Sequence, residues 1–128
     1  MGGDDAFSGG LGDDVLWGGT GRDRLNGGGG ANTFVFDNLA GADTIIDFET
    51  GVDRIDLSLI DANLNTVEND SFNFVGTDAF DGHARQLRFG PTHGGNILIE
   101  GDIDGNGTAD FRLLLLGIHS LITDSFVL

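Results

Sequence analysis

Hydrophobic and polar positions recur with a period of nine residues along the first part of the chain. Large apolar side chains occupy every ninth position: Phe7, Leu16, Leu25 and Phe34. A carboxylate or amide stands two positions before each of them: Asp5, Asp14, Asp23 and Asn32. Glycines fill much of the remainder, which excludes a helix because Gly destabilises helix interiors. The pattern predicts Gly-rich turns, each followed by a short strand whose central apolar side chain points inward.

Two such repeats make one full coil, with strands on opposite faces. Each repeat then stacks in register on the next but one, which gives a parallel β-roll. A disordered Gly-rich linker is the alternative for such a composition. We reject it because a linker does not place Leu or Phe at strict nine-residue intervals.

Stacking of the Gly-rich turns is expected to create cation sites, because each turn exposes backbone carbonyls and one carboxylate at its rim. Without a cation the facing carboxylates repel, whereas Ca²⁺ takes oxygen ligands of this kind. The first and third repeats share one rim: Gly3, Asp5, Gly18, Gly19, Thr20, Gly21 and Asp23. The second and fourth share the other: Gly10, Gly12, Asp14, Gly27, Gly28, Gly29, Gly30 and Asn32. Asn32 lacks the charge, so its site should be weaker.

From Phe36 onward, alternating and short apolar runs predict further strands. These cover 44–48, 54–57, 71–75, 86–89, 96–100 and 109–116, with a hairpin turn at 104–107 and a loop at 62–67. We expect them to continue the roll and to cap its edge. The expected fold class is all-β: a nonapeptide-repeat β-roll over 1–36, followed by a strand-rich capping region over 37–128.

Composition narrows the function. The net charge is −15, with six Arg and no Lys, which argues against nucleic acid and anionic membranes and favours cations. There is no Cys, so disulfides and thiol chemistry are excluded. No segment has the length and apolar character of a membrane helix, and the N-terminus does not resemble a signal peptide. Because the first repeat is truncated, we expect the natural protein to continue upstream.

Other candidate chemistry is weaker. The segment 102–110 places acidic or amide oxygens as an EF-hand loop does, but Leu113 stands where that loop has Glu. Hairpin turn chemistry explains the same residues. The three His, at 83, 93 and 119, are widely separated, and neither a His-Glu-x-x-His motif nor a Gly-x-Ser-x-Gly elbow occurs. We expect the chain not to be an enzyme.

Several segments resemble the C-terminal region of serralysin-type (peptidase M10) proteins with repeat-in-toxin (RTX) repeats. They are the nonapeptides, then 41–48, 51–58 and 101–111, and the closing 124–128. The resemblance implies several bound Ca²⁺ ions, one of them held near Asp37 and Asp43. It also implies an uncleaved C-terminal signal for an ABC-type (type I) exporter. The family's tail is an acidic residue followed by three apolar ones, whereas here Ser125 follows Asp124.

The sequence therefore predicts a secreted, extracellular module that folds on Ca²⁺ and is exported unfolded. Deleting 124–128 should abolish export without changing calcium-dependent folding. The upstream domain is expected to be a metalloprotease or another secreted hydrolase. An alternative function is an accessory module that binds polysaccharide or another substrate for such an enzyme.

Overall fold

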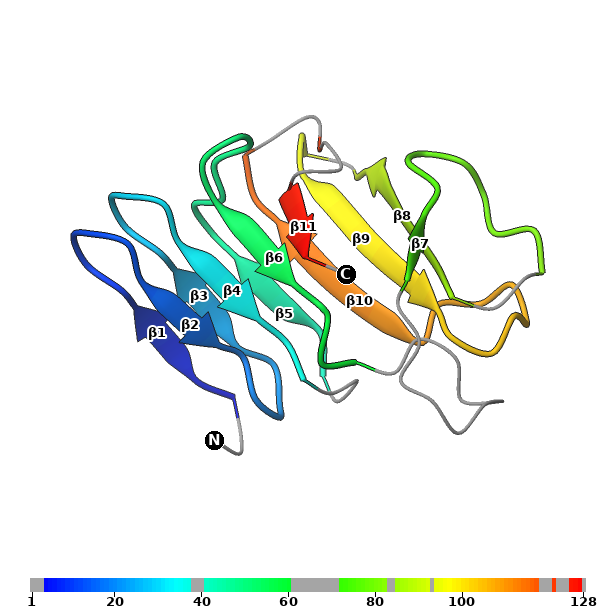
Figure 1. The fold of residues 1–128 in the computed structure, drawn as a ribbon, viewed down its shortest axis with the longest axis horizontal. Coiled ribbons are helices and arrows are strands. Elements are labelled where there is room, and N and C mark those ends of the chain that lie inside the picture. The colour runs from blue at the N-terminus through cyan, green and yellow to red at the C-terminus, as the bar shows by residue number, and fades with distance from the viewer. Residues whose placement is uncertain are drawn as a thin grey trace.

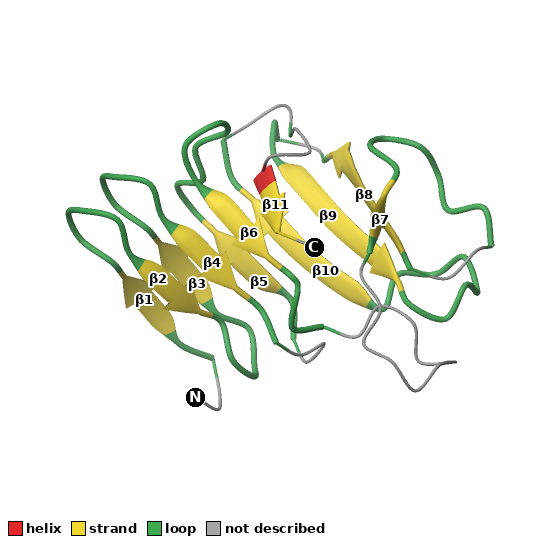
Figure 2. Cartoon of the chain, in the orientation of Figure 1, coloured by secondary structure: helices red, strands yellow, loops and turns green. Residues whose placement is uncertain are grey.

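The computed structural model describes residues 4–37, 41–60, 72–82, 85–92, 94–117, 121 and 125–127. Strands joined by turns stack into two facing sheets in this part of the chain (Figures 1 and 2). Within these ranges, no helix has the length and hydropathy to cross a membrane. Gly3, the three His, the predicted loop at 62–67 and both Asp124 and Leu128 lie outside the described residues.

Six three-residue strands form the roll. They are β1 (Ala6–Ser8), β2 (Val15–Trp17), β3 (Arg24–Asn26), β4 (Thr33–Val35), β5 (Asp43–Ile45) and β6 (Arg54–Asp56). Odd-numbered strands lie in one sheet and even-numbered strands in the other. Neighbours run parallel and in register, with Phe7 opposite Leu25 and Leu16 opposite Phe34. The predicted stacking of each repeat on the next but one is confirmed.

The parallel stack extends past the four nonapeptides. Leu25 is paired with Ile45, and Phe34 with Ile55, so β5 and β6 add a further strand to each sheet of the roll. Each of these strands begins at or just after an Asp that stands two residues before the inward Ile, as in the repeats. The predicted strand at 44–48 ends early, at Ile45. Asp47 already belongs to the next turn, where its Oδ1 accepts the N–H of Gly27.

Beyond the roll, the first sheet changes direction. Its strand order is β1-β3-β5-β10-β9-β8-β7, where β7 is Asn73–Phe74, β8 is Gln86–Pro91, β9 is Ile97–Asp102 and β10 is Phe111–Leu115. Strand β10 is parallel to β5 but antiparallel to β9, and β9 is antiparallel to β8. The predicted hairpin between the last two long strands is therefore present, and Figure 1 shows β10, β9 and β8 continuing the sheet beyond the roll, to the right in this view.

The C-terminal strand β11 (Phe126–Val127) completes the second sheet, whose order is β11-β6-β4-β2. It runs parallel to β6, with Phe126 opposite Ile55. Phe126 is only 8% exposed and belongs to the core. The structure argues against the expectation that 124–128 can be deleted without affecting folding, because the deletion would remove β11 and a core side chain.

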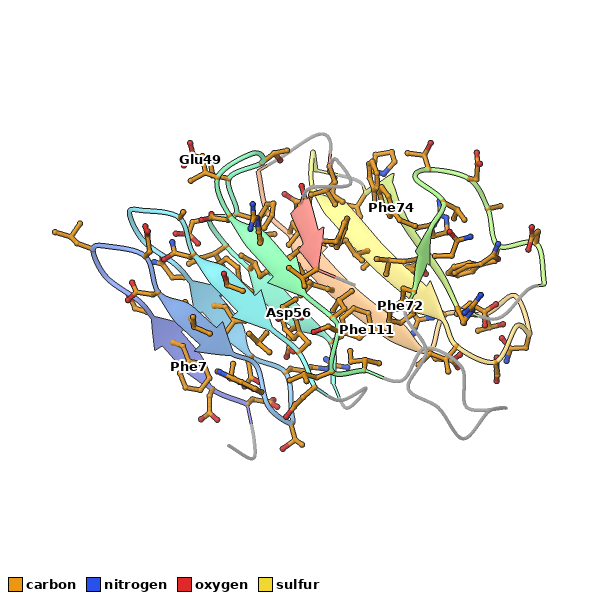
Figure 3. The ribbon with its side chains drawn as sticks, viewed as in Figure 1. Phe7, Glu49, Asp56, Phe72, Phe74 and Phe111 are labelled. Carbon is orange, nitrogen blue, oxygen red and sulfur yellow. The ribbon has the colours of Figure 1, made fainter. Side chains whose placement is uncertain are left out.

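The core lies between the two sheets and runs without a break from the repeats into the cap. The inward positions of the roll are fully buried: Leu25, Phe34, Ile45 and Ile55. Phe111 of the cap contacts Phe36 with ring centroids 6.0 Å apart, and Phe74 contacts Phe126 at 4.9 Å. Figure 3 shows Phe7 at the opposite end, where it is only partly buried.

Candidate metal centre

Strand geometry explains why the repeat carboxylates are buried. Residues two apart on a strand face the same side, so an Asp two positions before an inward apolar residue also points inward. Asp23 is accordingly 1% exposed beside Leu25, and Asp43 is 6% exposed beside Ile45. Because these carboxylates sit where each turn enters its strand, they line the inner rim of the Gly-rich turns. Burial of this kind requires partners for every carboxylate oxygen.

One oxygen of each buried side chain is used to join successive turns. The N–H of Asp5 donates to Oδ1 of Asp23 at 2.9 Å, and the N–H of Asp23 donates to Oδ1 of Asp43 at 2.8 Å. On the other side, the N–H of Asp14 donates to Oδ1 of Asn32 at 3.0 Å, and the N–H of Asn32 donates to Oδ1 of Asp53 at 2.8 Å. We call these two columns the Asp ladder: Asp5, Asp23 and Asp43, and Asp14, Asn32 and Asp53.

The second oxygen has no partner at two steps of the ladder. Oδ2 of Asp14 and Oδ2 of Asp23 are buried and make no hydrogen bond. Leaving a buried charged oxygen unpaired costs several kcal/mol, in rough terms, so such atoms call for a counter-charge. Burial likewise raises the pKa of Asp43 from 3.8 to about 6; the N–H of Asp23 opposes the rise and the charge of Asp23 adds to it. A cation would relieve all three groups.

The turns stack closely enough to supply carbonyl ligands beside these carboxylates. The N–H of Gly29 donates to the carbonyl of Gly10 at 3.1 Å, and a side chain at Gly28 would overlap that same carbonyl. Gly30 approaches the carbonyl of Gly12 in the same way, and Gly41 approaches that of Gly21. The second and fourth repeats are thus brought together as the sequence predicts. The groups that could act as metal ligands here are carbonyl and carboxylate oxygens, the type that Ca²⁺ prefers.

The other predicted ligands lie in or near the same turns, but not all of them are brought next to a buried carboxylate. Gly18 lies close to Oδ2 of Asp43, and the N–H of Gly27 donates to Oδ1 of Asp47 at 2.9 Å. Gly19 and Thr20 lie in the turn of the third repeat. Asp37 is exposed, whereas Asp43, its expected partner, is buried in the Asp ladder.

Several acidic residues of these turns were not among the predicted ligands, and two of them, Asp4 and Asp13, accept the N–H groups of Arg22 and Ala31 in the stacked turns. Asp53 continues the second column of the ladder, and its Oδ2 accepts the N–H of Glu49 at 2.9 Å. Asp47 spans to the fourth repeat, where its two oxygens accept the N–H groups of Gly27 and Gly28. The triplet Asp53-Arg54-Ile55 repeats the Asp-x-apolar spacing and was the available signal, although it follows Asn32 by 21 residues rather than 18.

A second acidic group lies in the β9–β10 hairpin, where ligand atoms of Asp102, Asp104 and Asp110 fall within 4.8 Å of one another. Its chemistry differs from that of the ladder. Both oxygens of the buried Asp102 accept backbone N–H groups, from Gly105 at 2.9 Å and from Gly107 at 2.8 Å. The carboxylate of Asp102 therefore already has partners, as hairpin turn chemistry predicts.

Comparison with known families places this geometry in context. Residues 4–128 match the family model described as "Peptidase M10 serralysin C terminal". The match covers both the repeats and the capping region.

Two individual proteins are similar to the chain. Metalloprotease AprA of Pseudomonas entomophila (strain L48) is 39% identical over 101 residues, which cover 74% of this chain. The aligned part is 20% of AprA, so the chain spans about a fifth of that relative. The solution structure of the AlgE6R3 subunit from the Azotobacter vinelandii mannuronan C5-epimerase superposes with a TM-score of 0.57 at 27% identity. That superposition covers 98% of this chain and 78% of the subunit.

Proposed function

Because this chain belongs to the serralysin C-terminal family of peptidase M10, with an RTX-type β-roll, we propose that it is a non-catalytic module that folds on extracellular Ca²⁺. The 1–36 repeats would bind ions first, and 37–128 would cap the roll and carry a type I secretion signal. The module would serve an upstream domain of a secreted protein. A secreted metalloprotease is the natural candidate for that domain, given the similarity to AprA.

One observation carries the calcium proposal. Asp14 and Asp23 each keep a buried oxygen that no hydrogen bond satisfies, beside turns rich in backbone carbonyls. A divalent cation at each position would neutralise the carboxylate and coordinate the carbonyls together. Asp43, whose pKa is raised by burial, would be held ionised by the same charge.

Most of the remaining predicted ligands would contribute oxygens from the Gly-rich turns. The first side would use Gly3, Asp5, Gly18, Gly19, Thr20 and Gly21, and the second Gly10 and Gly12. The other residues predicted for the second side, Gly27, Gly28, Gly29 and Gly30, lie in the turn that holds Asn32 instead of a carboxylate, and they are not part of the proposed ligand set. Asp37 would contribute to an ion beyond the repeats. Asp47 and Asp53 already accept two backbone hydrogen bonds each, so they would position turns rather than depend on an ion.

Calcium would act as a switch between export and folding. Where free Ca²⁺ is scarce, the buried carboxylates of Asp14 and Asp23 would oppose folding of the repeats, which would stay open. Extracellular modules bind Ca²⁺ with Kd values of about 10⁻⁴–10⁻³ M, which suits filling outside the cell. An ion that binds only the folded state stabilises it by roughly 2.7 kcal/mol at a hundredfold excess over Kd. Two or more such sites would rival the stability of a small domain.

The secretion signal is proposed for 124–128, read by an ABC exporter before folding. A substitution at Val127, which is 38% exposed, separates this role from folding better than a deletion does. We expect V127S, which adds no charge beside the paired Asp56, to lower the export of a reporter fused ahead of the module, while calcium-dependent folding stays close to wild type. Undiminished export of V127S together with a folded V127S would argue against a signal at this residue.

The experiment that tests the calcium proposal is a far-UV circular dichroism titration from chelated protein. We expect the β signal to increase between submillimolar and millimolar Ca²⁺ as the repeats fold, and Mg²⁺ at the same concentration to be much less effective. A spectrum that Ca²⁺ leaves unchanged, with no ion bound in equilibrium dialysis, would reject the proposal. Glycan binding is not adopted as the function, because the net charge of −15 repels anionic polymers.

A further inference from the structure

Asn32 occupies the carboxylate position of the fourth repeat, and both ends of its side-chain amide are engaged. Its Oδ1 accepts the N–H of Asp14 at 3.0 Å. Its Nδ2 lies 3.4 Å from the carbonyl oxygen of Gly28, 3.5 Å from that of Gly29 and 3.4 Å from that of Gly30. Asn32 is 1% exposed, so its amide is shielded from water, whereas Gly28, Gly29 and Gly30 are themselves exposed. The amide group thus sits among three carbonyl oxygens of its own turn.

The surroundings fix the orientation of this amide. The N–H of Asp14 takes the amide oxygen as its acceptor, and the buried NH₂ group of Asn32 needs acceptors, which the three glycine carbonyls supply. Rotating the amide by half a turn would place its oxygen against three oxygens and its NH₂ against an N–H group. The observed orientation is therefore the one that the hydrogen-bond network selects.

The same position holds an aspartate elsewhere in the ladder, with a different result. Oδ1 of Asp23 accepts the N–H of Asp5, so Oδ2 of Asp23 is the atom equivalent to Nδ2 of Asn32. That oxygen is buried and has no hydrogen-bond partner, and an ionised carboxylate has no proton to donate. Asn32 supplies N–H groups at the point where Asp23 presents an unsatisfied negative oxygen.

We propose that Asn32 takes the place of a bound cation with its own amide, so that the turn at 27–32 closes without Ca²⁺. This inference rests on the proposed function, because it requires the Asp14 and Asp23 positions to take Ca²⁺. Asp53, the next member of the same column, is also satisfied internally, by the N–H groups of Asn32 and Glu49. Within the column of Asp14, Asn32 and Asp53, dependence on Ca²⁺ is thereby limited to the Asp14 position.

The test converts the amide into the carboxylate found in the other repeats. Asn32→Asp keeps the Oδ1 acceptor but replaces three N–H···O contacts with a buried negative oxygen. We expect equilibrium dialysis to show one more Ca²⁺ bound per chain than in wild type, and urea unfolding in chelator to occur at a lower midpoint. Asn73→Asp is the matched control, because it adds the same charge on an exposed strand residue. It should change neither quantity.

The reciprocal variant, Asp23→Asn, tests the same inference if Asn32→Asp does not fold. Asp23→Asn keeps the acceptor for Asp5 and adds N–H groups, so it should bind one Ca²⁺ fewer and unfold at a higher urea concentration in chelator. A wild type that binds Ca²⁺, with unchanged stoichiometry in both variants, would overturn the inference alone. A wild type that binds no Ca²⁺ would overturn the proposed function itself.

Discussion

The N–H of Asp23 donates a 2.8 Å hydrogen bond to Oδ1 of Asp43, twenty residues further along the chain. This bond joins the last recognisable repeat on its side of the roll to a turn that the nonapeptide pattern does not reach. It also brings two buried carboxylates together, with Asp23 1% and Asp43 6% exposed. The stability of the roll without a bound cation therefore depends on the protonation of these two carboxylates.

The first prediction concerns pH in the presence of chelator. Burial raises the pKa of Asp43 to about 6, so between pH 3.8 and about 6 the folded chain holds more protons there than the unfolded chain. Stability from this group consequently falls as the pH rises through that window. Asp43→Asn keeps the acceptor for Asp23 and removes the charge. We expect it to stabilise the chelated protein by up to about 3 kcal/mol at pH 7.5 and by little at pH 4.

Urea unfolding at the two pH values measures this difference. Asp104→Asn removes the same charge from an exposed loop and should show no comparable dependence on pH. An equal effect of Asp43→Asn at both pH values would contradict the assignment.

The second prediction compares two glycines with the same backbone conformation. Gly41 has φ +86° and Gly51 has φ +88°, so alanine strains both by about 1 kcal/mol. At Gly51 the added Cβ meets nothing within 4 Å, whereas at Gly41 it would overlap the carbonyl of Gly21 in the stacked turn. We expect Gly41→Ala to cost roughly 1–3 kcal/mol more than Gly51→Ala.

Thermal or urea unfolding in saturating Ca²⁺ compares the two variants directly. If they lose the same stability, the turns at Gly21 and Gly41 do not stack as closely as described.

The third prediction concerns the C-terminal strand. Phe126 packs against Phe74 and is 8% exposed, so Phe126→Ala should cost about 3–5 kcal/mol. Val127 alternates to the outer face, and Val127→Ala should cost less than about 1 kcal/mol. Unfolding in saturating Ca²⁺ measures both. Near-equal losses would mean that the tail does not dock on β6.

The fourth prediction concerns removal of Ca²⁺ and is read by hydrogen exchange. Unsatisfied carboxylates lie in the early turns, whereas β8, β9 and β10 are held by antiparallel ladders and a buried core. Chelator should therefore raise exchange by at least about tenfold at amides of β1 to β3, such as that of Arg24, and much less at β8 to β10. Uniform loss of protection would show instead that the whole chain folds only with Ca²⁺.

The roll could be predicted because its period is strict. Each repeat carries the same Asp-x-apolar triplet, so the stacking of Leu16 on Phe34 follows from spacing alone. The further strands β5 and β6 carry the triplet too, but longer turns shift it, to 20 residues after Asp23 and 21 after Asn32. The nine-residue period therefore ends at Phe34, although the Asp-x-apolar triplets and the stacked strands continue to Ile55.

The partner of the tail could not be predicted from the sequence. A two-residue strand such as Phe126–Val127 has too few positions to show periodicity, and its pairing with β6 bridges most of the chain. The role of Asn32 was hidden for a different reason. Its residue type suggested only a weaker site, whereas its contacts depend on which way the amide points.

The pairing of β11 with β6 also bears on which tail residues a receptor could reach. The edge that receives Phe126 consists of Arg54–Asp56, which itself pairs with β4, so this docking site exists only where β6 has joined the roll. In the folded chain Phe126 is buried, whereas Val127 is 38% exposed. A receptor that reads the side chain of Phe126 must therefore bind before β11 pairs with β6, whereas one that reads only Val127 has no such constraint.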